Sequence, residues 1–296
     1  MDDSLLREKL DALHAQLNRR ALVSPDPLEV VYRYDDPRDR EVAGLIAACL
    51  AYGRVAQILR NLHALLDALG PAPADVIRRE GTGAVARLPH FRHRWTGAEE
   101  MSAFLGGISD ALQRHGSLEA CFLAHHAVSH QDTLSALTGF TRELRGCDTP
   151  NSLLSAPDKG SACKRLHLYL RWMVRRDEVD PGCWTGVSPS ALLIPLDTHM
   201  HRVSRGLGLT RRKQADLATV IEVTRGFRRI NPADPLKYDF ALTRLGIRSE
   251  LDPEDFLREC GVSAKRIRAL RDPVAGATPR ASSRTVRSIQ RKSPGR

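Results

Sequence analysis

The chain has 296 residues, enough for one large or two modest domains with a substantial core. It has no apolar run long enough to span a membrane, its MDDSLLREKL start does not resemble a secretory leader, and its six scattered cysteines form no C-x-x-C pair, which disfavours a disulfide framework and a cysteine zinc site. The formal net charge of +10 favours an anionic partner, first of all nucleic acid, over a merely solvated basic surface.

Residues 1–70 carry three helical patterns. Leucines recur every three or four residues in the first, which predicts an amphipathic opening helix, at Leu6, Leu10, Leu13 and Leu17. Asp36-Pro37 is typical of a helix N-cap followed by proline at the first helical position. The run EVAGLIAACLAYG that follows predicts a helix buried on several sides and broken at Gly53. RVAQILRNLHALLDAL predicts another helix, which ends at Gly70-Pro71.

Residues 71–160 are less regular. Residues 71–97 mix proline, glycine and arginine and predict no single element. AEEMSAFLGGISDALQRHG predicts a helix that ends at Gly116, and residues 146–160 predict a loop rich in turn residues.

Residues 161–270 return to helical periodicity. In KRLHLYLRWMVRR the apolar positions fall on one continuous face, formed by Leu166, Tyr169, Leu170, Met173 and Val174. Asp234-Pro235 predicts a helix start with a stop at Gly246, and Asp252-Pro253 predicts another with a stop at Gly261. Since no segment shows sustained period-2 alternation, we expect an all-α fold over residues 1–270.

The last segment, residues 271–296, has seven basic residues, one acidic residue and almost no large apolar side chains. This composition predicts a disordered basic tail. It is either a solvated tail or a nonspecific phosphate contact, and it carries more than half of the net charge.

The stretch IPLDTHMHRV, residues 194–203, allows three interpretations of its acid. In these interpretations Asp197 caps a helix, holds a metal with His199 and His201, or acts as a single catalytic carboxylate. Asp-x-His-x-His resembles the metal motif of amidohydrolases, but that motif needs a strand end in a β/α barrel, and on a helix the two histidines diverge. Capping by Asp197 does not explain the cationic residues that follow it. Cations in the first turns of a helix favour an anionic ligand near the helix N-terminus.

PLDTHMHRVSRGLGL resembles the "V-D-T-H-hydrophobic-x-R-V" stretch of the helix-hairpin-helix DNA glycosylases of the endonuclease III superfamily. LIAACLAYGRVAQILRNLHALL, FLGGISDALQRHGSLEACF and DPLKYDFALTRLGI also resemble helices of that superfamily, so the resemblance spans roughly residues 40–250. It implies two helical subdomains flanking a cleft. KRLHLYLRWMVRRDEVDPG-W and DPLKYDFALTRLGI further resemble a bacterial domain-of-unknown-function family, the one numbered twenty-four hundred.

Two features depart from the superfamily. Its hairpin usually reads L-P-G-hydrophobic-G, followed by a lysine in bifunctional members, whereas LLSAPDKGSACKRL keeps one proline and Gly160, with two lysines available, Lys159 and Lys164. The spacing of Lys164 and Asp197 is similar to that of the archaeal 8-oxoguanine glycosylases. The iron–sulfur cysteine loop is absent, since Cys260 stands alone, and no cofactor is expected.

The resemblance implies base excision, in which a base is extruded into a pocket and a sugar cation is stabilised as the C–N bond breaks. Asp197 would supply the carboxylate, and Lys164, whose side of the helix also carries Arg171 and Arg175, would attack the sugar and form a Schiff base. Tyr52, Trp184, Tyr238 and Asp239 are candidates for the base pocket, and Lys159, Gly160, His199 and Arg202 for DNA contact, with simple packing or solvation as the alternative for each.

The primary hypothesis is thus a DNA glycosylase that acts on damaged duplex DNA, either with or without AP lyase activity. It is expected to be a cytoplasmic, nucleoid-associated monomer that does not bind membranes and holds no metal. Two alternatives stay open. One is a noncatalytic nucleic-acid-binding module that kept the fold, and the other is a metal-dependent hydrolase that uses the Asp-x-His-x-His stretch.

Overall fold

The computed structural model describes residues 2–88, 90–127, 131–146, 151–247 and 251–270. These residues are mostly α-helical, as predicted. They also form one antiparallel hairpin with two residues in each strand, β1 (Arg92–His93) and β2 (Thr96–Gly97). The predicted disordered tail, residues 271–296, lies outside the described residues. Within the described ranges, no helix is both long and apolar enough to cross a membrane.

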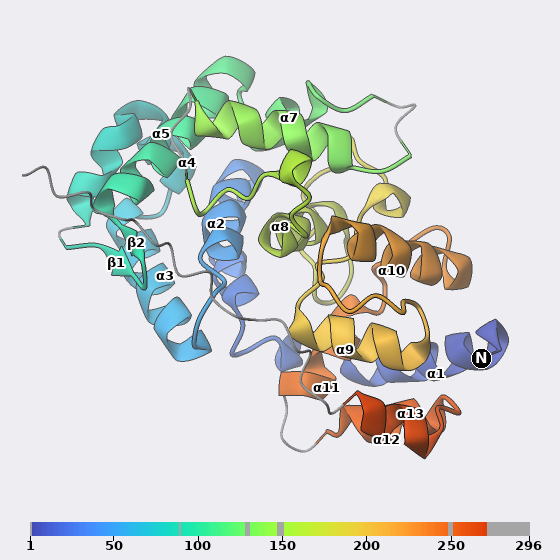
Figure 1. Ribbon diagram of the computed structural model, residues 1–296. Coiled ribbons are helices and arrows are strands. Elements are labelled where there is room, and N and C mark those ends of the chain that lie inside the picture. The colour runs from blue at the N-terminus through green and yellow to red at the C-terminus, as the bar shows by residue number, and fades with distance from the viewer. Residues whose placement is uncertain (1, 89, 128–130, 147–150, 248–250, 271–296) are drawn as a thin grey trace, which may run out of the picture.

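The helices form two groups (Figure 1). In the first, α2 packs against α3, α4, α6 and α8, and α5 packs against α4, α6 and α7. Its helices are α2 (Pro37–Cys49), α3 (Val55–Leu69), α4 (Pro73–Glu80), α5 (Ala98–His115), α6 (Leu118–Leu123), α7 (Leu134–Arg145) and α8 (Lys164–Val174).

The second group joins the two ends of the described chain, because α1 packs against α10 and α11, while α9 packs against α11 and α12. Its helices are α1 (Asp3–Leu17), α9 (Thr198–Leu207), α10 (Leu217–Ile230), α11 (Asp239–Ile247), α12 (Pro253–Glu259) and α13 (Ala264–Ala269). Short 3₁₀ helices connect the elements at η1 (Arg20–Leu22), η2 (Pro27–Arg33), η3 (Gly81–Arg87), η4 (Pro157–Lys159) and η5 (Pro189–Ala191).

The centre of the first group is α2, which the apolar run predicted to be buried. From Val42 to Cys49 every residue of this helix is buried. It lies so close to α8 that a Cβ on Gly44 would be 2.8 Å from the Met173 Cε atom. The small side chain therefore sets how closely α8, and the residues at its N-terminus, approach the core.

Most predicted helix boundaries are confirmed. The Asp36, Asp197 and Asp252 side chains each accept a hydrogen bond from a backbone amide in the first turn of a helix. The predicted start at Asp234-Pro235 is wrong, since α11 begins at Asp239. Asp234 instead binds the Arg175 side chain at 3.0 and 3.1 Å and accepts the Leu236 amide, so a turn precedes the helix.

Candidate functional site

A cavity of about 320 Å³ lies where the first turn of α8, the start of α9 and α11 meet. The residues before α2 and around the start of α3 complete its wall. Its charged lining consists of Asp26, Lys164, Arg171, Asp197, Asp239 and Arg244, and its apolar lining includes Ala51, Val55, Ile58, Leu168, Pro195 and Phe240. A mostly apolar wall with a few convergent charged groups is typical of a small-molecule or nucleobase site.

Lys164 and Asp197, which lie on different helices, both line this cavity. Lys164 is the first residue of α8 and is half-buried. Within the described residues its amine makes no hydrogen bond or ion pair. An amine that faces a cavity without a carboxylate partner is available to a ligand.

Asp197 is the N-cap of α9, as one of the three interpretations predicted. Its Oδ1 accepts the Met200 amide at 2.8 Å. In the described part of the chain Oδ2 has no hydrogen-bond partner, so capping uses only one of the two oxygens. The carboxylate can therefore cap the helix and still act on a ligand in the cavity.

Asp239 lines the same cavity from the first residue of α11 but is buried and paired, with Oδ2 2.5 Å from the Arg171 Nη1 atom. Burial raises the pKa of the Asp239 carboxyl, Arg171 opposes this effect and the charge of Asp197 adds to it. Asp239 thus lies in the predicted pocket as part of a charged wall.

Arg171 leads into a buried ion network behind the cavity. Its guanidinium also binds Asp180 at 3.0 Å, and Asp180 binds Arg175 in turn. Arg175 further pairs with Asp177 and Asp234, at 2.9 and 3.0 Å. We predicted that Arg171 and Arg175 share the side of Lys164. Arg171 lines the cavity with the lysine, whereas Arg175 is buried and neutralised by three carboxylates.

Three cavity residues escaped the sequence analysis: Asp26, Phe240 and Arg244. Asp26 caps η2 through the Leu28 amide and binds Arg244 at 2.5 Å, and the Arg244 guanidinium lies 4.4 Å from the centre of the Phe240 ring. Asp26-Pro27 has the same Asp-Pro signal as Asp36-Pro37, which could have indicated a cap. No local pattern shows that residues 26 and 244 meet.

Tyr52 lies beside the cavity rather than in its lining. It lines an adjoining hollow of about 330 Å³ together with Arg54 and Arg94, and Gly53 belongs to both hollows. The Tyr52 ring stacks on Trp95, with ring centres 4.9 Å apart, and Trp95 is 63% exposed at the tip of the β1–β2 hairpin. This aromatic pair places an exposed ring next to basic side chains at the edge of the cavity.

Residues 26–248, three quarters of the chain, match the family described as "Protein of unknown function (DUF2400)". The chain belongs to this family. The matched span includes Lys164, Asp197 and Asp239. No curated protein and no solved structure matches the chain.

In this DUF2400 member, two predicted base-pocket residues belong to the core instead. Trp184 is 3% exposed, packs against Phe122 and Tyr169, and donates its Nε1 hydrogen to Glu41 at 2.7 Å. Tyr238 is 2% exposed and donates its hydroxyl to Asp11 on α1 at 2.9 Å. Packing uses both rings, so neither faces the cavity.

The polar residues after Asp197 are also used for packing, which corrects their predicted role in phosphate contact. The Nε2 atom of His199 donates to the Leu242 carbonyl oxygen, and the Nε2 atom of His201 donates to the Arg212 carbonyl oxygen. The Arg202 side chain pairs with Glu254. The two histidines thus bind carbonyls of different segments, which gives the metal-hydrolase hypothesis no common site. Of the two arginines that follow, Arg202 pairs with Glu254 of α12 and so points away from the helix N-terminus.

Lys159 and Gly160 are exposed in the connection between α7 and α8, where the superfamily hairpin was sought. The connection contains the short η4 turn, which ends at Gly160 with φ +74°. Lys159 lines a second cavity of about 590 Å³ together with Arg142 and Arg145, opposed by Glu100 and Asp158. Three cationic side chains and two carboxylates thus line this hollow.

Proposed function

We propose that the protein is a DNA glycosylase with Schiff-base lyase activity, acting on a damaged base through Lys164 and Asp197. The single observation that supports this proposal most strongly is that these two residues, 33 positions apart in the chain, line one cavity. The sequence resemblance independently implies a catalytic role for the same two residues. Helix capping explains the position of Asp197, but it does not explain why Lys164 lines the same cavity.

The chemistry follows from the two groups. The neutral Lys164 amine attacks C1′ of the deoxyribose, the new N–C1′ bond replaces the C1′–N bond to the base, and the base departs with the bonding electron pair. The nitrogen then gives a proton to the departing base, and the C1′–O4′ bond breaks as the C1′=N bond of the Schiff base forms, with O4′ taking up a proton from the medium. The carboxylate of Asp197 stabilises the positive charge that develops on the sugar as the base departs.

The cavity walls suit an extruded base. Phe240, Leu168 and Ile58 provide apolar surface, and Arg171 and Asp239 provide hydrogen-bonding groups on the α8–α11 side. Enzymes that act on a base inside a duplex hold the flipped base between apolar side chains and read its polar edge. The Arg171–Asp239 pair would read that edge.

The surfaces beside the cavity suit nucleic acid. The exposed Trp95 ring, stacked on Tyr52 and 4.6 Å from the Arg94 guanidinium, offers a face and a cation to an unpaired base. Arg142, Arg145 and Lys159 offer cations to phosphates at the other hollow. DNA is the partner class that uses both kinds of surface.

Borohydride trapping on a panel of lesion duplexes tests the proposal. We expect a covalent protein–DNA adduct with the wild type, none with Lys164→Ala, and an undiminished one with Lys265→Ala, a control lysine that is exposed on α13 and lines neither hollow. Asp197→Asn should reduce base release by at least about a hundredfold, since one transition-state electrostatic contact is worth about 10²–10³ in rate.

The same experiment decides between catalysis and the alternative of a noncatalytic module. A protein that binds duplex DNA with strong salt dependence, traps no adduct and releases no base from any duplex is the noncatalytic module. An adduct that persists in Lys164→Ala would remove this lysine as the nucleophile.

A further inference from the structure

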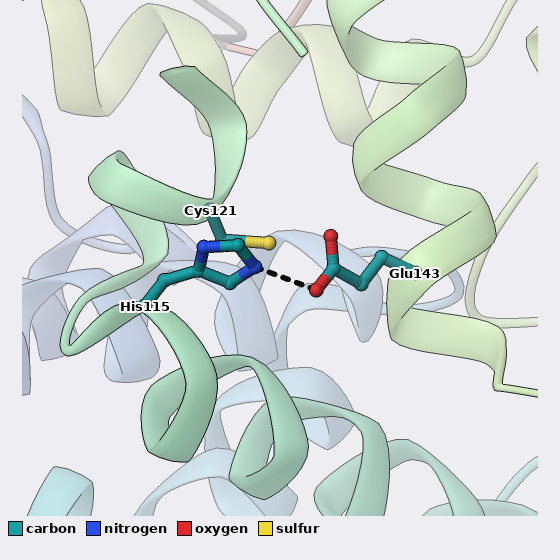
Figure 2. A group of neighbouring side chains, drawn as sticks. All are labelled: His115, Cys121 and Glu143. Carbon is teal, nitrogen blue, oxygen red and sulfur yellow. Dashed lines mark hydrogen bonds and ion pairs between the residues drawn. The ribbon is translucent and has the colours of Figure 1, made fainter. Parts of the chain in front are cut away.

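A cluster of three potential metal ligands lies in the first helix group, away from the residues that line the Lys164 cavity. His115 is the last residue of α5, Cys121 lies in α6 and Glu143 lies in α7 (Figure 2). One ligand atom from each residue lies within 4.8 Å of the other two. Among the described residues, this is the group of histidine, cysteine and acidic side chains that is close enough to share an ion.

We infer that His115, Cys121 and Glu143 form a binding site for a divalent transition-metal ion of the zinc class. An imidazole nitrogen, a thiolate and a carboxylate oxygen are the three ligand types that zinc uses in proteins. With bonds of about 2.0–2.3 Å, ligand atoms around a tetrahedral ion are about 3.3–3.8 Å apart. The nitrogen and oxygen, 2.6 Å apart now, have to separate when an ion binds.

Neighbouring residues orient the ligands as second-layer partners do in metal sites. The His125 Nε2 atom lies 2.8 Å from Glu143 Oε2, while His115 lies at Oε1. His125 can therefore hold one carboxylate oxygen while the other oxygen binds the ion. Three protein ligands leave a fourth position, which water would fill.

The backbone holds the three elements close together. A Cβ on Gly107 of α5 would be 1.8 Å from the Leu144 carbonyl oxygen, so α5 and α7 touch beside Glu143. A Cβ on Gly139 would be 2.5 Å from the His125 ring. These two contacts need glycine, and they place the ligand-bearing positions against one another before any ion binds.

The charges are consistent with a cation site. Burial raises the pKa of Glu143, but hydrogen bonds from His125, His115 and Arg114 outweigh burial and lower this pKa to about 2, so the carboxylate is ionised. Arg114, whose side chain is 61% exposed, contacts the same oxygen as His115 and has to swing into solvent when an ion binds. Burial raises the pKa of the Cys121 thiol to about 12, so binding releases its proton.

Cobalt(II) and zinc(II) are the probes. Full-length protein is stripped with a chelator and titrated with Co²⁺, and we expect roughly one ion per chain and a thiolate-to-cobalt charge-transfer band. Cys121→Ser should lose the band, whereas Cys260→Ser, an equally buried cysteine elsewhere, should keep it. His125→Ala should weaken Zn²⁺ binding about 10–100-fold, as expected for a second-layer partner.

His115→Gln supplies a second ligand variant in case the buried Cys121→Ser chain does not fold, because the His115 side chain is partly exposed. It should also abolish stoichiometric uptake. Failure of the folded wild type to take up Co²⁺, or an unchanged band in Cys121→Ser or stoichiometric uptake by His115→Gln, overturns the metal site and leaves an ion-pair cluster. None of these three outcomes depends on the glycosylase proposal, whose trapping assay uses other residues.

Discussion

The cavity pair, Lys164 and Asp197, contrasts with the ion network of Arg171, Arg175 and Asp180, although both involve α8. Lys164 has no partner among the described residues, and Asp197 uses one oxygen. The side chains of Arg171, Arg175 and Asp180 are at most 4% exposed, and each of the two guanidinium groups meets at least two carboxylates.

The difference shows how position on one helix separates two uses of charge. A buried charge has to be paired, or it destabilises the fold, so Arg171 and Arg175 are used for structure. A charge at a cavity edge keeps its hydration and can stay unpaired. We therefore expect substitutions in the network to change stability and substitutions of the cavity pair to change chemistry.

The largest effect is expected for Asp180→Ala, which removes a carboxylate shared by two buried guanidinium groups. The free energy of unfolding should fall by about 3–5 kcal/mol, because removing one partner of a buried ion pair costs about this much and here two guanidinium groups each lose a partner. Urea denaturation measures this change. Asp35→Ala, which removes an exposed ion pair with Arg40, is the control and should change it by less than about 1 kcal/mol. A similar small cost for Asp180→Ala would contradict the structural role of the network.

His167, on the same helix, should produce a pH effect of about 3 kcal/mol. Burial lowers the pKa of its ring to about 4, below the ordinary value of 6.5, and within the described residues neither ring nitrogen has a hydrogen-bond partner. The unfolded chain binds this proton first, so the stabilising contribution is present above pH 6.5 and is lost as the pH falls towards 4. The unfolding free energy of the wild type should therefore fall by about 3 kcal/mol more than that of His167→Leu as the pH falls from neutral towards 4. Parallel curves for His167→Leu would refute this assignment.

Asp197 should show an intermediate effect that separates capping from chemistry. Asp197→Ala should lower the unfolding free energy by about 1 kcal/mol, whereas Asp197→Asn, which keeps a capping oxygen, should lower it by only a few tenths. Both variants should lose base release. Retained base release in Asp197→Asn together with a normal cap would reduce Asp197 to a purely structural residue.

The smallest change in stability is expected for Lys164→Met. Because the amine has no partner to lose and is only half-buried, the unfolding free energy should stay within about 0.5 kcal/mol of the wild type. Arg171→Met in the same denaturation series should cost several kcal/mol. A large cost for Lys164→Met would show that the cavity lysine, too, is structural.

Much of the fold was predictable because its signals are local. Periodic leucines placed α1, and Asp-Pro caps placed α2 and α12, since a cap and a proline act on the residues beside them. The start of α11 was predicted wrongly because Asp234 has a stronger partner in Arg175, which lies 59 residues away. Helices α4, α6, α7, α10 and α13 and the β1–β2 hairpin were not predicted at all.

The candidate site was predictable only in part. Lys164 and Asp197 were recognised through the resemblance, but the roles of Trp184, Tyr238, His199 and Arg202 depended on which way their side chains point. Residue type alone does not distinguish a tryptophan that stacks on a base from one that fills the core. The contribution of Asp26, Phe240 and Arg244 to the cavity is likewise a matter of distant contacts.

The sequence by itself determined the mostly α-helical class, the starts of α1, α2, α3, α5, α8 and α12 and the cap at Asp197, because these depend on interactions within a few residues. Only the tertiary structure decided that Lys164 and Asp197 share a cavity, that Arg175 is buried in an ion network, and that His115, Cys121 and Glu143 meet. Those arrangements depend on how closely α2, α5, α7 and α8 pack, and glycines at positions 44 and 107 control two of those approaches.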